Sequence, residues 1–403
     1  MAESITVTYE KKPLPAWLKT WSMILVVVGL AASAGAFAMD PQRATFASNI
    51  GYMLAMSIGL GSMFLIAIEY VAGAVWSVPI RRIAEFMTNA LWIAPILGLP
   101  ILLNILNHWF DMYHWTHLED VMNDPFLKQK RPYLNEQSFL IRTGIIWAGS
   151  LIFKTLIVGN SYKQDKDPDQ KYSKRNIKLS ALFLAFFAIS ITLTAIDFMM
   201  SLEPHWYSTI FGVYYFAGSF ATAVAIITLF VLSFNKNDLL IYGVNKDHYY
   251  SLGGWMFAFT AFWMYMAFSQ FMLIWYANIP EETFWFMPRM EGGWAVVSAL
   301  LIFIKFIIPF GMLIQRESKT NPSRLRFAAI WIIAAHIYDL YWVIYPTYSH
   351  LTDNHSPVFG WQELGPVILT LGLTLLAFRV AASKRNYVAV GDPKLERGLN
   401  FHL

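Results

Sequence analysis

An apolar helix gives way to two carboxylates in the stretch FSQFMLIWYANIPEE, Phe268–Glu282. With the residues before it, from about residue 253, the apolar part is long enough to cross a bilayer, which takes about 20 residues. Pro280 and the two glutamates end it, because proline interrupts a helix and charged groups avoid hydrocarbon. We therefore expect this stretch to be the mouth of a membrane-spanning helix.

The same pattern recurs along the whole chain, which is 57% hydrophobic and only 14% charged over 403 residues. A soluble domain carries about 25% charged residues, so the composition indicates an all-α integral membrane protein. The long apolar runs predict about ten spans, at residues 16–39, 45–75, 80–108, 136–160, 177–201, 207–234, 253–279, 292–315, 325–348 and 361–383. The first span ends in AGAFAMD, which is similar to a signal-peptide cleavage site, but a long polar leader precedes it and we expect a retained helix.

Lysine and arginine are distributed unevenly between the two sets of loops. The two termini and four alternate loops hold 22 of these residues, whereas the opposite loops hold five. Because cytoplasmic loops accumulate Lys and Arg, we expect both termini to be cytoplasmic. The outer loops instead carry carboxylates, which suit the docking of an extrinsic protein better than the binding of nucleic acid: Asp111, Glu119, Asp120, Asp124, Glu281, Glu282, Glu291 and Asp353.

Residues 45–204 and residues 205–350 share a series of motifs in the same order. The motif Tyr52-x-x-Ala55-x-Ser57 in span 2 recurs as Tyr214-x-x-Ala217-x-Ser219 in span 6. Three further matches are Asn104-x4-Trp109 with Gln270-x4-Trp275, Asp197-x6-Pro204 with Asp339-x6-Pro346, and, more loosely, Trp147 with Trp294. Both halves begin on the same side of the membrane. We therefore predict two parallel-repeat four-helix bundles, spans 2–5 and 6–9, with span 1 (within 1–44) and span 10 (within 351–403) at the periphery.

Two stretches carry a resemblance to a known family: Phe268–Glu282, quoted above, and DFMMSLEPHWYSTIFGVYYFAGSF, Asp197–Phe220. With the doubled four-helix plan, they resemble the NrfD/polysulfide-reductase family of integral membrane subunits. More narrowly, the chain is similar to the F-type subunits of bacterial alternative complex III, a quinol:cytochrome c oxidoreductase. The likeness covers spans 2 to 9, and the short cytoplasmic tail favours the F type over the related C type.

This resemblance implies a multi-pass subunit of a respiratory complex in the bacterial inner membrane, not an enzyme that acts alone. The implied partners are a homologous integral C-type subunit and extrinsic iron–sulfur and haem c subunits on the outer face. The chain itself would hold no redox cofactor. Quinone binding and proton half-channels are both ascribed to F-type subunits, so both are expectations for this chain.

A charge inside a membrane span costs about 3 kcal/mol on insertion scales, so it usually has a partner or a function. The candidates for buried ionisable groups are Glu69, Lys154, Asp197, Lys305, His336 and Asp339. His336 and Asp339 are three residues apart, so they share one helical face. A histidine beside a carboxylate can exchange protons near neutral pH. We expect a proton route through Glu69, Lys305, His336 and Asp339, with Asp197, Glu203 and His205 receiving protons near the outer surface.

Structural roles remain open for each of these groups. His336 and Asp339 could be a polar pair that joins neighbouring helices. Asp197 and Asp339 occupy matching repeat positions and could each accept a hydrogen bond from an adjacent helix. Lys154 lies near the cytoplasmic end of its span, so we expect its side chain to extend to the interface.

The polar residues at the mouth of span 7 have three interpretations. The aromatic pair Trp275 and Tyr276 fits an interfacial anchor, followed by a helix stop at Pro280. A quinone ring needs donors beside apolar contacts, and a groove that supplies them would be lined by Gln270, Trp275, Tyr276 and Asn278. The two glutamates that follow could instead dock a partner.

Several cofactor and enzyme classes are not expected. The chain has no cysteine, which excludes a disulfide, a protein-ligated iron–sulfur cluster and a thioether-linked haem. Of nine histidines only His336 is clearly inside the membrane, whereas a bis-histidine haem b needs two. Two other readings remain: an autonomous secondary transporter and a purely structural scaffold. The transporter is disfavoured because no central helix is broken by paired glycines and prolines.

Overall fold

The structure is a computed structural model that describes residues 9–352 and 356–403, so the predicted outer-loop carboxylate Asp353 lies outside the described residues. Within them the chain folds into helices, and ten segments are long and apolar enough to cross a membrane. The predicted all-α membrane fold of about ten spans is therefore confirmed.

Seven of the ten spans are single uninterrupted helices, and the other three contain a break or a terminal turn. In chain order the helices of the spans are α1 (Ala16–Met39), α2 (Pro41–Ala72), α3 (Arg81–Met87) with α4 (Ala90–Asn107), α7 (Glu136–Gln164), α8 (Gln170–Phe198) with the short turn Met200–Leu202, α9 (Phe211–Lys236), α10 (Lys246–Ala277), α12 (Gly292–Ile302) with a π-helical segment (Phe303–Ile307) and α13 (Ile308–Leu313), α15 (Pro322–Leu351), and α16 (Trp361–Lys384). The connections and the tail add α5 (Leu118–Asn123), α6 (Pro125–Lys130), α11 (Pro280–Thr283), α14 (Arg316–Thr320) and α17 (Leu395–Leu399).

The third span is broken where one continuous helix was predicted over residues 80–108. The break falls at Thr88 and Asn89, between α3 and α4. Their side chains bond to backbone carbonyls three residues earlier, Thr88 to Glu85 and Asn89 to Phe86. Such side-chain bonds compete with the helical ladder, which accounts for the interruption.

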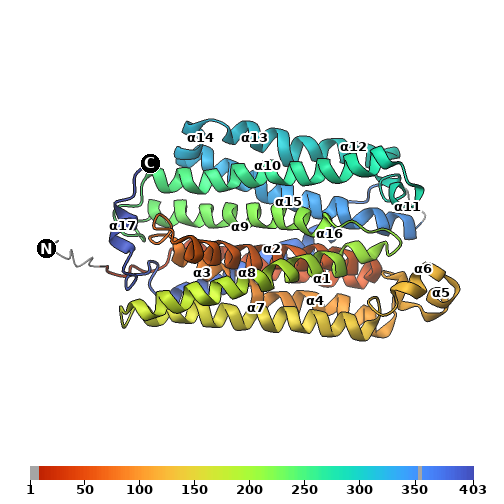
Figure 1. Cartoon of the computed structure of the whole chain (residues 1–403), viewed down its shortest axis with the longest axis horizontal. Coiled ribbons are helices and arrows are strands. Elements are labelled where there is room, and N and C mark those ends of the chain that lie inside the picture. The colour runs from red at the N-terminus through yellow and green to blue at the C-terminus, as the bar shows by residue number, and fades with distance from the viewer. Residues whose placement is uncertain (1–8, 353–355) are drawn as a thin grey trace.

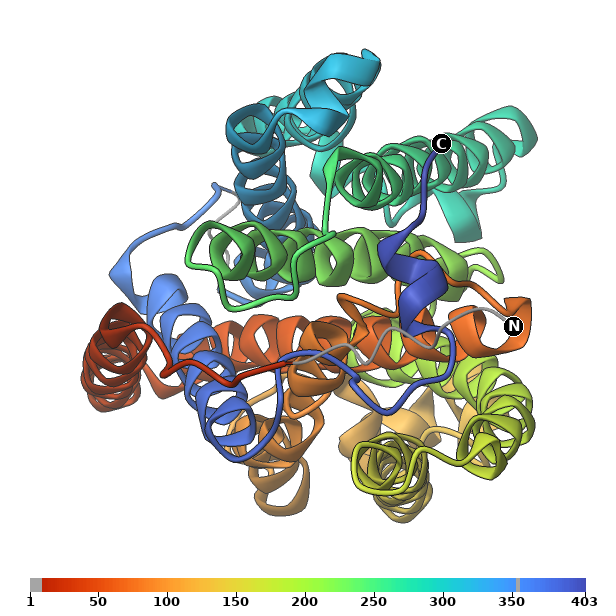
Figure 2. The same ribbon diagram turned by 90° about the vertical axis from the view of Figure 1, so that its left-hand side faces the viewer.

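Two central helices organise the molecule. α2 and α9 lie against each other, with α4, α7 and α8 on the α2 side and α10, α12, α13 and α15 on the α9 side (Figure 2). α1 packs mainly on α16 and the pair covers one flank of α2. This arrangement matches the two predicted four-helix bundles with spans 1 and 10 at the periphery.

Both ends of the described chain lie at one end of the helices, and the α5, α6 and α11 connections lie at the other (Figure 1). We call these ends the terminal face and the opposite face. The central pair approaches closely because α2 has a glycine at position 61: a Cβ there would lie 2.6 Å from the Ala223 Cβ of α9. In lipid there is no hydrophobic driving force between helices, so their association depends on close packing, which small residues permit.

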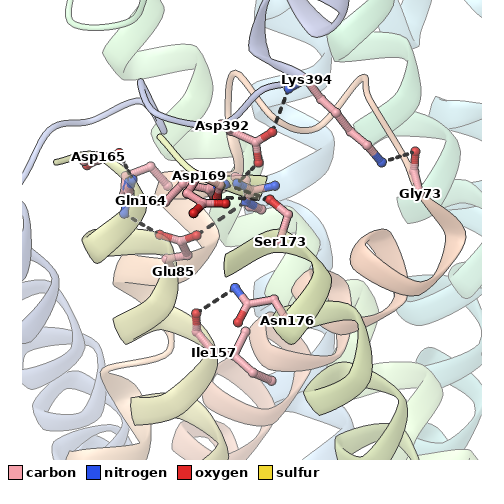
Figure 3. Close-up of polar contacts among 12 residues, drawn as sticks. Gly73, Glu85, Ile157, Gln164, Asp165, Asp169, Ser173, Asn176, Asp392 and Lys394 are labelled. Atoms are coloured by element: carbon pink, nitrogen blue, oxygen red, sulfur yellow. Dashed lines mark hydrogen bonds and ion pairs between the residues drawn. The ribbon is translucent and has the colours of Figure 1, made fainter. Parts of the chain in front are cut away.

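One buried ion pair and one hydrogen bond hold the C-terminal tail against the terminal face (Figure 3). Asp392 lies 2.5 Å from the Arg81 guanidinium, and Lys394 donates to the Gly73 carbonyl at 3.1 Å. Beside this clamp Arg82 pairs with Glu85 at 2.8 Å. The ends of α2 and α3 are thereby tied to the tail.

The Asp392 clamp should be sensitive to pH. Burial alone would raise the pKa of the Asp392 carboxyl, but the Arg81 guanidinium outweighs it and holds the pKa below the ordinary value of 3.8. A depressed folded-state pKa contributes stability that is present above about pH 4 and is lost as pH falls through the folded-state pKa. We expect Asp392→Asn to lower the free energy of unfolding by about 1.5–3 kcal/mol at pH 7, and the difference from the wild type to vanish in strong acid.

Thermal unfolding of the detergent-solubilised protein between pH 7 and pH 3 measures this difference. Asp167→Asn is the matched control, because Asp167 pairs with Lys171 on the exposed surface at 2.9 Å and such pairs contribute little. A loss for Asp392→Asn that stayed constant down to pH 3 would contradict the assignment to an ionised carboxylate.

Candidate functional site

A buried polar network lies where the two bundles meet. The Lys305 ammonium is 2.8 Å from His336 Nδ1 and 2.9 Å from Asp339 Oδ2. The three residues are 6%, 1% and 2% exposed, respectively. The shared helical face predicted for His336 and Asp339 is present, and Lys305 from the preceding span bridges the two.

The network continues to α2 through hydroxyl groups. The Tyr214 hydroxyl donates to the second carboxylate oxygen of Asp339. On the other side, Ser57 Oγ lies 3.0 Å from His336 Nε2 and 2.9 Å from Ser219 Oγ. From here on, the polar network denotes Ser57, Tyr214, Lys305, His336 and Asp339.

For Lys305 in its charged form, the hydrogen bonds assign the proton positions in the polar network. A lysine ammonium has only donors, so His336 Nδ1 accepts from Lys305 and the imidazole proton lies on Nε2, directed at Ser57. Asp339 accepts from Lys305 and Tyr214, as an ionised carboxylate does. The network therefore holds one cation, one anion and a neutral imidazole, which together carry no net charge.

A π-helical segment, Phe303–Ile307, places Lys305 in the network. Pro309 has no N–H to offer the carbonyl of Lys305 four residues earlier, so the α-helical ladder cannot continue there. A wider turn relieves this conflict, and such π segments are frequent at functional sites. Trp331 of α15 anchors the segment by donating to the Ile304 carbonyl at 2.8 Å.

Glycine and tryptophan shape the space around the ammonium. A Cβ on Gly218 would lie 2.9 Å from His336 Nδ1 and 3.1 Å from Lys305 Nζ, so only glycine leaves the contact undisturbed. The Trp263 ring lies 5.2 Å from Lys305 Nζ, which is close enough for a cation–π interaction.

Two cavities are lined in part by residues of the polar network. One of about 10 Å³ lies on its terminal side, between Lys305, Thr260 and Ala221, and has room for a single water molecule. The other, of about 190 Å³, is lined on the opposite side by Tyr214, Gln270 and mostly apolar neighbours. The polar network and Trp263 therefore separate two small spaces along the membrane normal.

The matching aspartate of the first bundle has a different environment. Arg142 of α7 holds Asp197 with two hydrogen bonds of 2.9 Å, and Tyr133 donates a third at 2.9 Å. Asp197, Glu203 and His205, expected to receive protons together, each have a separate hydrogen-bond partner. Glu203 accepts from Thr347 at 2.9 Å, and His205 pairs with Asp124, whose pKa it lowers.

Neither a protein-family model nor a curated protein matches this chain.

Glu69 and Lys154 lie outside the polar network. Glu69 is buried near the terminal end of α2, three turns or about 18 Å from Ser57. Neither of its carboxylate oxygens has a hydrogen-bond partner in the described part of the chain. Lys154 does not extend freely to water as expected, because its ammonium donates to Asn89 at 3.0 Å, beside the break in the third span.

The four residues of the predicted quinone groove at the mouth of α10 differ in burial. Gln270 is buried and accepts from Ser208 at 2.9 Å, whereas Trp275 and Tyr276 are 67% and 85% exposed. Asn278 ends α10 in a left-handed conformation with φ of 50°. Gln270 lines the 190 Å³ cavity described above. The exposed aromatic pair fits the interfacial-anchor interpretation.

A further cavity lies at the opposite face. It measures about 650 Å³ and is bounded by the α8–α9 connection, the segment after α11 and the end of α15, with Glu203, His205, Met287 and Pro346 among its lining residues. No group of three or more His, Cys, Asp or Glu side chains suited to a metal ion occurs among residues 9–352 and 356–403.

Proposed function

We propose that this chain is an integral membrane subunit of a quinol:cytochrome c oxidoreductase of the alternative complex III type, in which it supports quinol oxidation and transfers protons without a redox centre of its own. The proposal rests on one observation, the buried polar network between the two bundles. The Lys305 ammonium lies within hydrogen-bonding distance of both an imidazole and a carboxylate. Ionisable groups buried in this way are costly in a membrane and mark proton relays in many membrane proteins.

The geometry of the network suits the transfer of a proton across it. Lys305 can pass a proton to His336 Nδ1 while Nε2 releases one to Ser57, so the imidazole returns to a neutral form. On the other branch, Asp339 can take a proton from Lys305 and accepts from the hydroxyl of Tyr214, a residue that lines the 190 Å³ cavity. The small cavity on the terminal side has room for one water molecule beside Lys305.

The proposed partners fit the chemistry of the two faces. The opposite face exposes carboxylates on its connections, including Glu119, Asp120, Glu281 and Glu291, and contains the 650 Å³ cavity. We assign this face to extrinsic iron–sulfur and haem c subunits, and the lipid-facing helices to a homologous integral C-type subunit. The lysine and arginine bias supports a cytoplasmic terminal face. The proposed location is the bacterial inner membrane.

Purification of the tagged chain from its native membranes in a mild detergent tests this function. The expected result is a coloured preparation that contains haem c and iron–sulfur signals and oxidises a quinol with cytochrome c as the acceptor. A colourless preparation that holds this chain alone would contradict complex membership and would favour the autonomous transporter.

A further inference from the structure

A basic pocket of about 540 Å³ opens at the terminal face, where the chain enters α1 and leaves α16. Four cationic side chains line it: Lys11, Lys12, Lys19 and Arg379. The remaining lining residues are apolar or uncharged, and none is a carboxylate. None of the four cations forms an ion pair with any residue in 9–352 or 356–403. The pocket therefore concentrates positive charge without a counter-ion from the described residues.

Hydrogen bonds fix the walls of this pocket. The Lys11 ammonium donates to the Ser383 carbonyl at 2.6 Å, and the buried Tyr387 hydroxyl donates to the Lys12 carbonyl at 2.8 Å. Two residues before Lys11, the Tyr9 hydroxyl donates to the Leu239 carbonyl at 3.1 Å. This bond anchors the segment before α1. These bonds hold like charges near one another, and an anion in the pocket would relieve their repulsion.

The pocket lies at a membrane boundary. α1 exposes apolar side chains over the turns next to the pocket, among them Trp17, Trp21 and Ile24, and tryptophan is enriched at the level of lipid headgroups. Farther from the terminal face, α1 and α16 are in close contact, since a Cβ on Gly29 would lie 2.4 Å from the Leu369 nitrogen. A ligand here would have its charged part among the cations and its apolar part along α1.

We propose that this pocket binds the phosphate headgroup of an anionic phospholipid from the leaflet at the terminal face, with the acyl chains against α1. Arginine can bind a phosphate in a bidentate manner, and lysine acts as a point charge. Basic pockets between membrane helices on the cytoplasmic side bind such headgroups in other proteins. The bound lipid joins the peripheral α1 to α16. This inference is independent of the proposed electron-transport function.

Native mass spectrometry of the full chain, released from nanodiscs of phosphatidylcholine doped with phosphatidylglycerol, tests the site. The wild type is expected to retain phosphatidylglycerol in preference to phosphatidylcholine. Each cation near the surface contributes about five-fold to the binding of anionic lipid. The triple variant Lys12→Gln/Lys19→Gln/Arg379→Gln should therefore bind phosphatidylglycerol about 100-fold more weakly. Lys11 is left in place because it braces the pocket wall.

The matched control removes the same charge from another part of the terminal face. Lys174, Arg175 and Lys178 lie near the start of α8, and Lys174→Gln/Arg175→Gln/Lys178→Gln should retain phosphatidylglycerol as the wild type does. Equal loss in both triple variants would show diffuse charge attraction and overturn the proposal. Displacement of the lipid by millimolar inorganic phosphate would also overturn it in favour of a free-anion site. If the triple variant does not fold, Arg379→Gln alone should weaken retention about five-fold, and an unchanged retention would overturn the site.

Discussion

Replacing Lys305 by methionine is expected to lower the free energy of unfolding by about 3–5 kcal/mol, which is the cost of leaving one member of a buried ion pair without its partner. Asp339 is 2% exposed and lies 2.9 Å from the Lys305 ammonium. Methionine has a similar volume but no charge, so the carboxylate would remain buried with the Tyr214 hydroxyl as its donor. This is the largest effect on stability that we expect from a single substitution in the polar network.

Replacing Asp339 should lower the free energy of unfolding less than replacing Lys305. Asp339→Asn leaves a buried lysine, and a lysine can lose its proton to become neutral. The double variant Lys305→Met/Asp339→Asn should therefore cost less than the sum of the two single variants, because neither charge is left unpaired. Denaturant unfolding of the four proteins in detergent gives the coupling free energy through a double-mutant cycle.

Lys154→Met is the matched control for Lys305→Met. Lys154 is only half-buried and loses one hydrogen bond, to Asn89, so its removal should cost about 1 kcal/mol. Equal losses for the two lysine variants, together with no coupling between Lys305 and Asp339, would show that the 2.9 Å contact does not carry the expected energy.

Much of the fold could be predicted because membrane spans leave a strong signal in the sequence. Runs of about 20 apolar residues locate the helices, and the motif order in the two halves indicates the two bundles. Two local features could not be located by hydropathy, since both lie inside apolar runs: the break at Thr88 and Asn89, and the π-helical segment around Lys305. Pro309 was a usable signal for the second, because it removes the partner of the Lys305 carbonyl.

The site was partly predictable. Lys305, His336 and Asp339 stood out as ionisable residues inside spans, and the helical spacing placed the last two on one face. The repeated Tyr-x-x-Ala-x-Ser motif was noticed only as evidence of duplication, although Ser57, Ser219 and Tyr214 belong to the same hydrogen-bonded system. The hydrogen bonds of Ser57 and Ser219 form only because α2 and α9 cross at these residues. The periodicity of a single helix does not predict where two helices cross.

Nearness in sequence does not predict contacts between helices. Asp197 is near Glu203 and His205 in sequence, but its ion-pair partner is Arg142 on the neighbouring helix. Gln270 is near Trp275 and Tyr276 in sequence, but Gln270 is buried and the two aromatic side chains are exposed. Arg142 lies inside the predicted span 136–160, and its charge is the sequence signal for the pair with Asp197.

The two bundles pair matching aspartates with cations of different chemistry. Asp197 is held by the Arg142 guanidinium, and Asp339 by the Lys305 ammonium. Arginine does not lose its proton in proteins, whereas a buried lysine can. The first pair therefore suits a fixed brace, and the second suits proton exchange. This contrast separates a structural role from a proton-transfer role for two positions related by duplication.

Charge-conserving exchanges at these two positions should accordingly have unequal effects. Lys305→Arg keeps the positive charge but removes the exchangeable proton, so we expect proton translocation by the reconstituted complex to fall about 100-fold, the usual contribution of a positioned acid–base group. Arg142→Lys should leave proton translocation unchanged and lower the free energy of unfolding by about 1 kcal/mol, because one of two parallel hydrogen bonds is lost. A pH-sensitive dye in proteoliposomes measures the first quantity, and thermal unfolding tracks the second.

A second variant separates lost proton transfer from lost packing. Arginine is bulkier than lysine, and the neighbouring Gly218 leaves little spare room, so Lys305→Arg could fail to assemble. His336→Gln keeps a donor and an acceptor but cannot carry a proton, and it should reduce proton translocation to a similar extent in an assembled complex. Full proton translocation in His336→Gln, or equal losses in Lys305→Arg and Arg142→Lys, would exclude the polar network as the route and leave it as a brace between the two bundles.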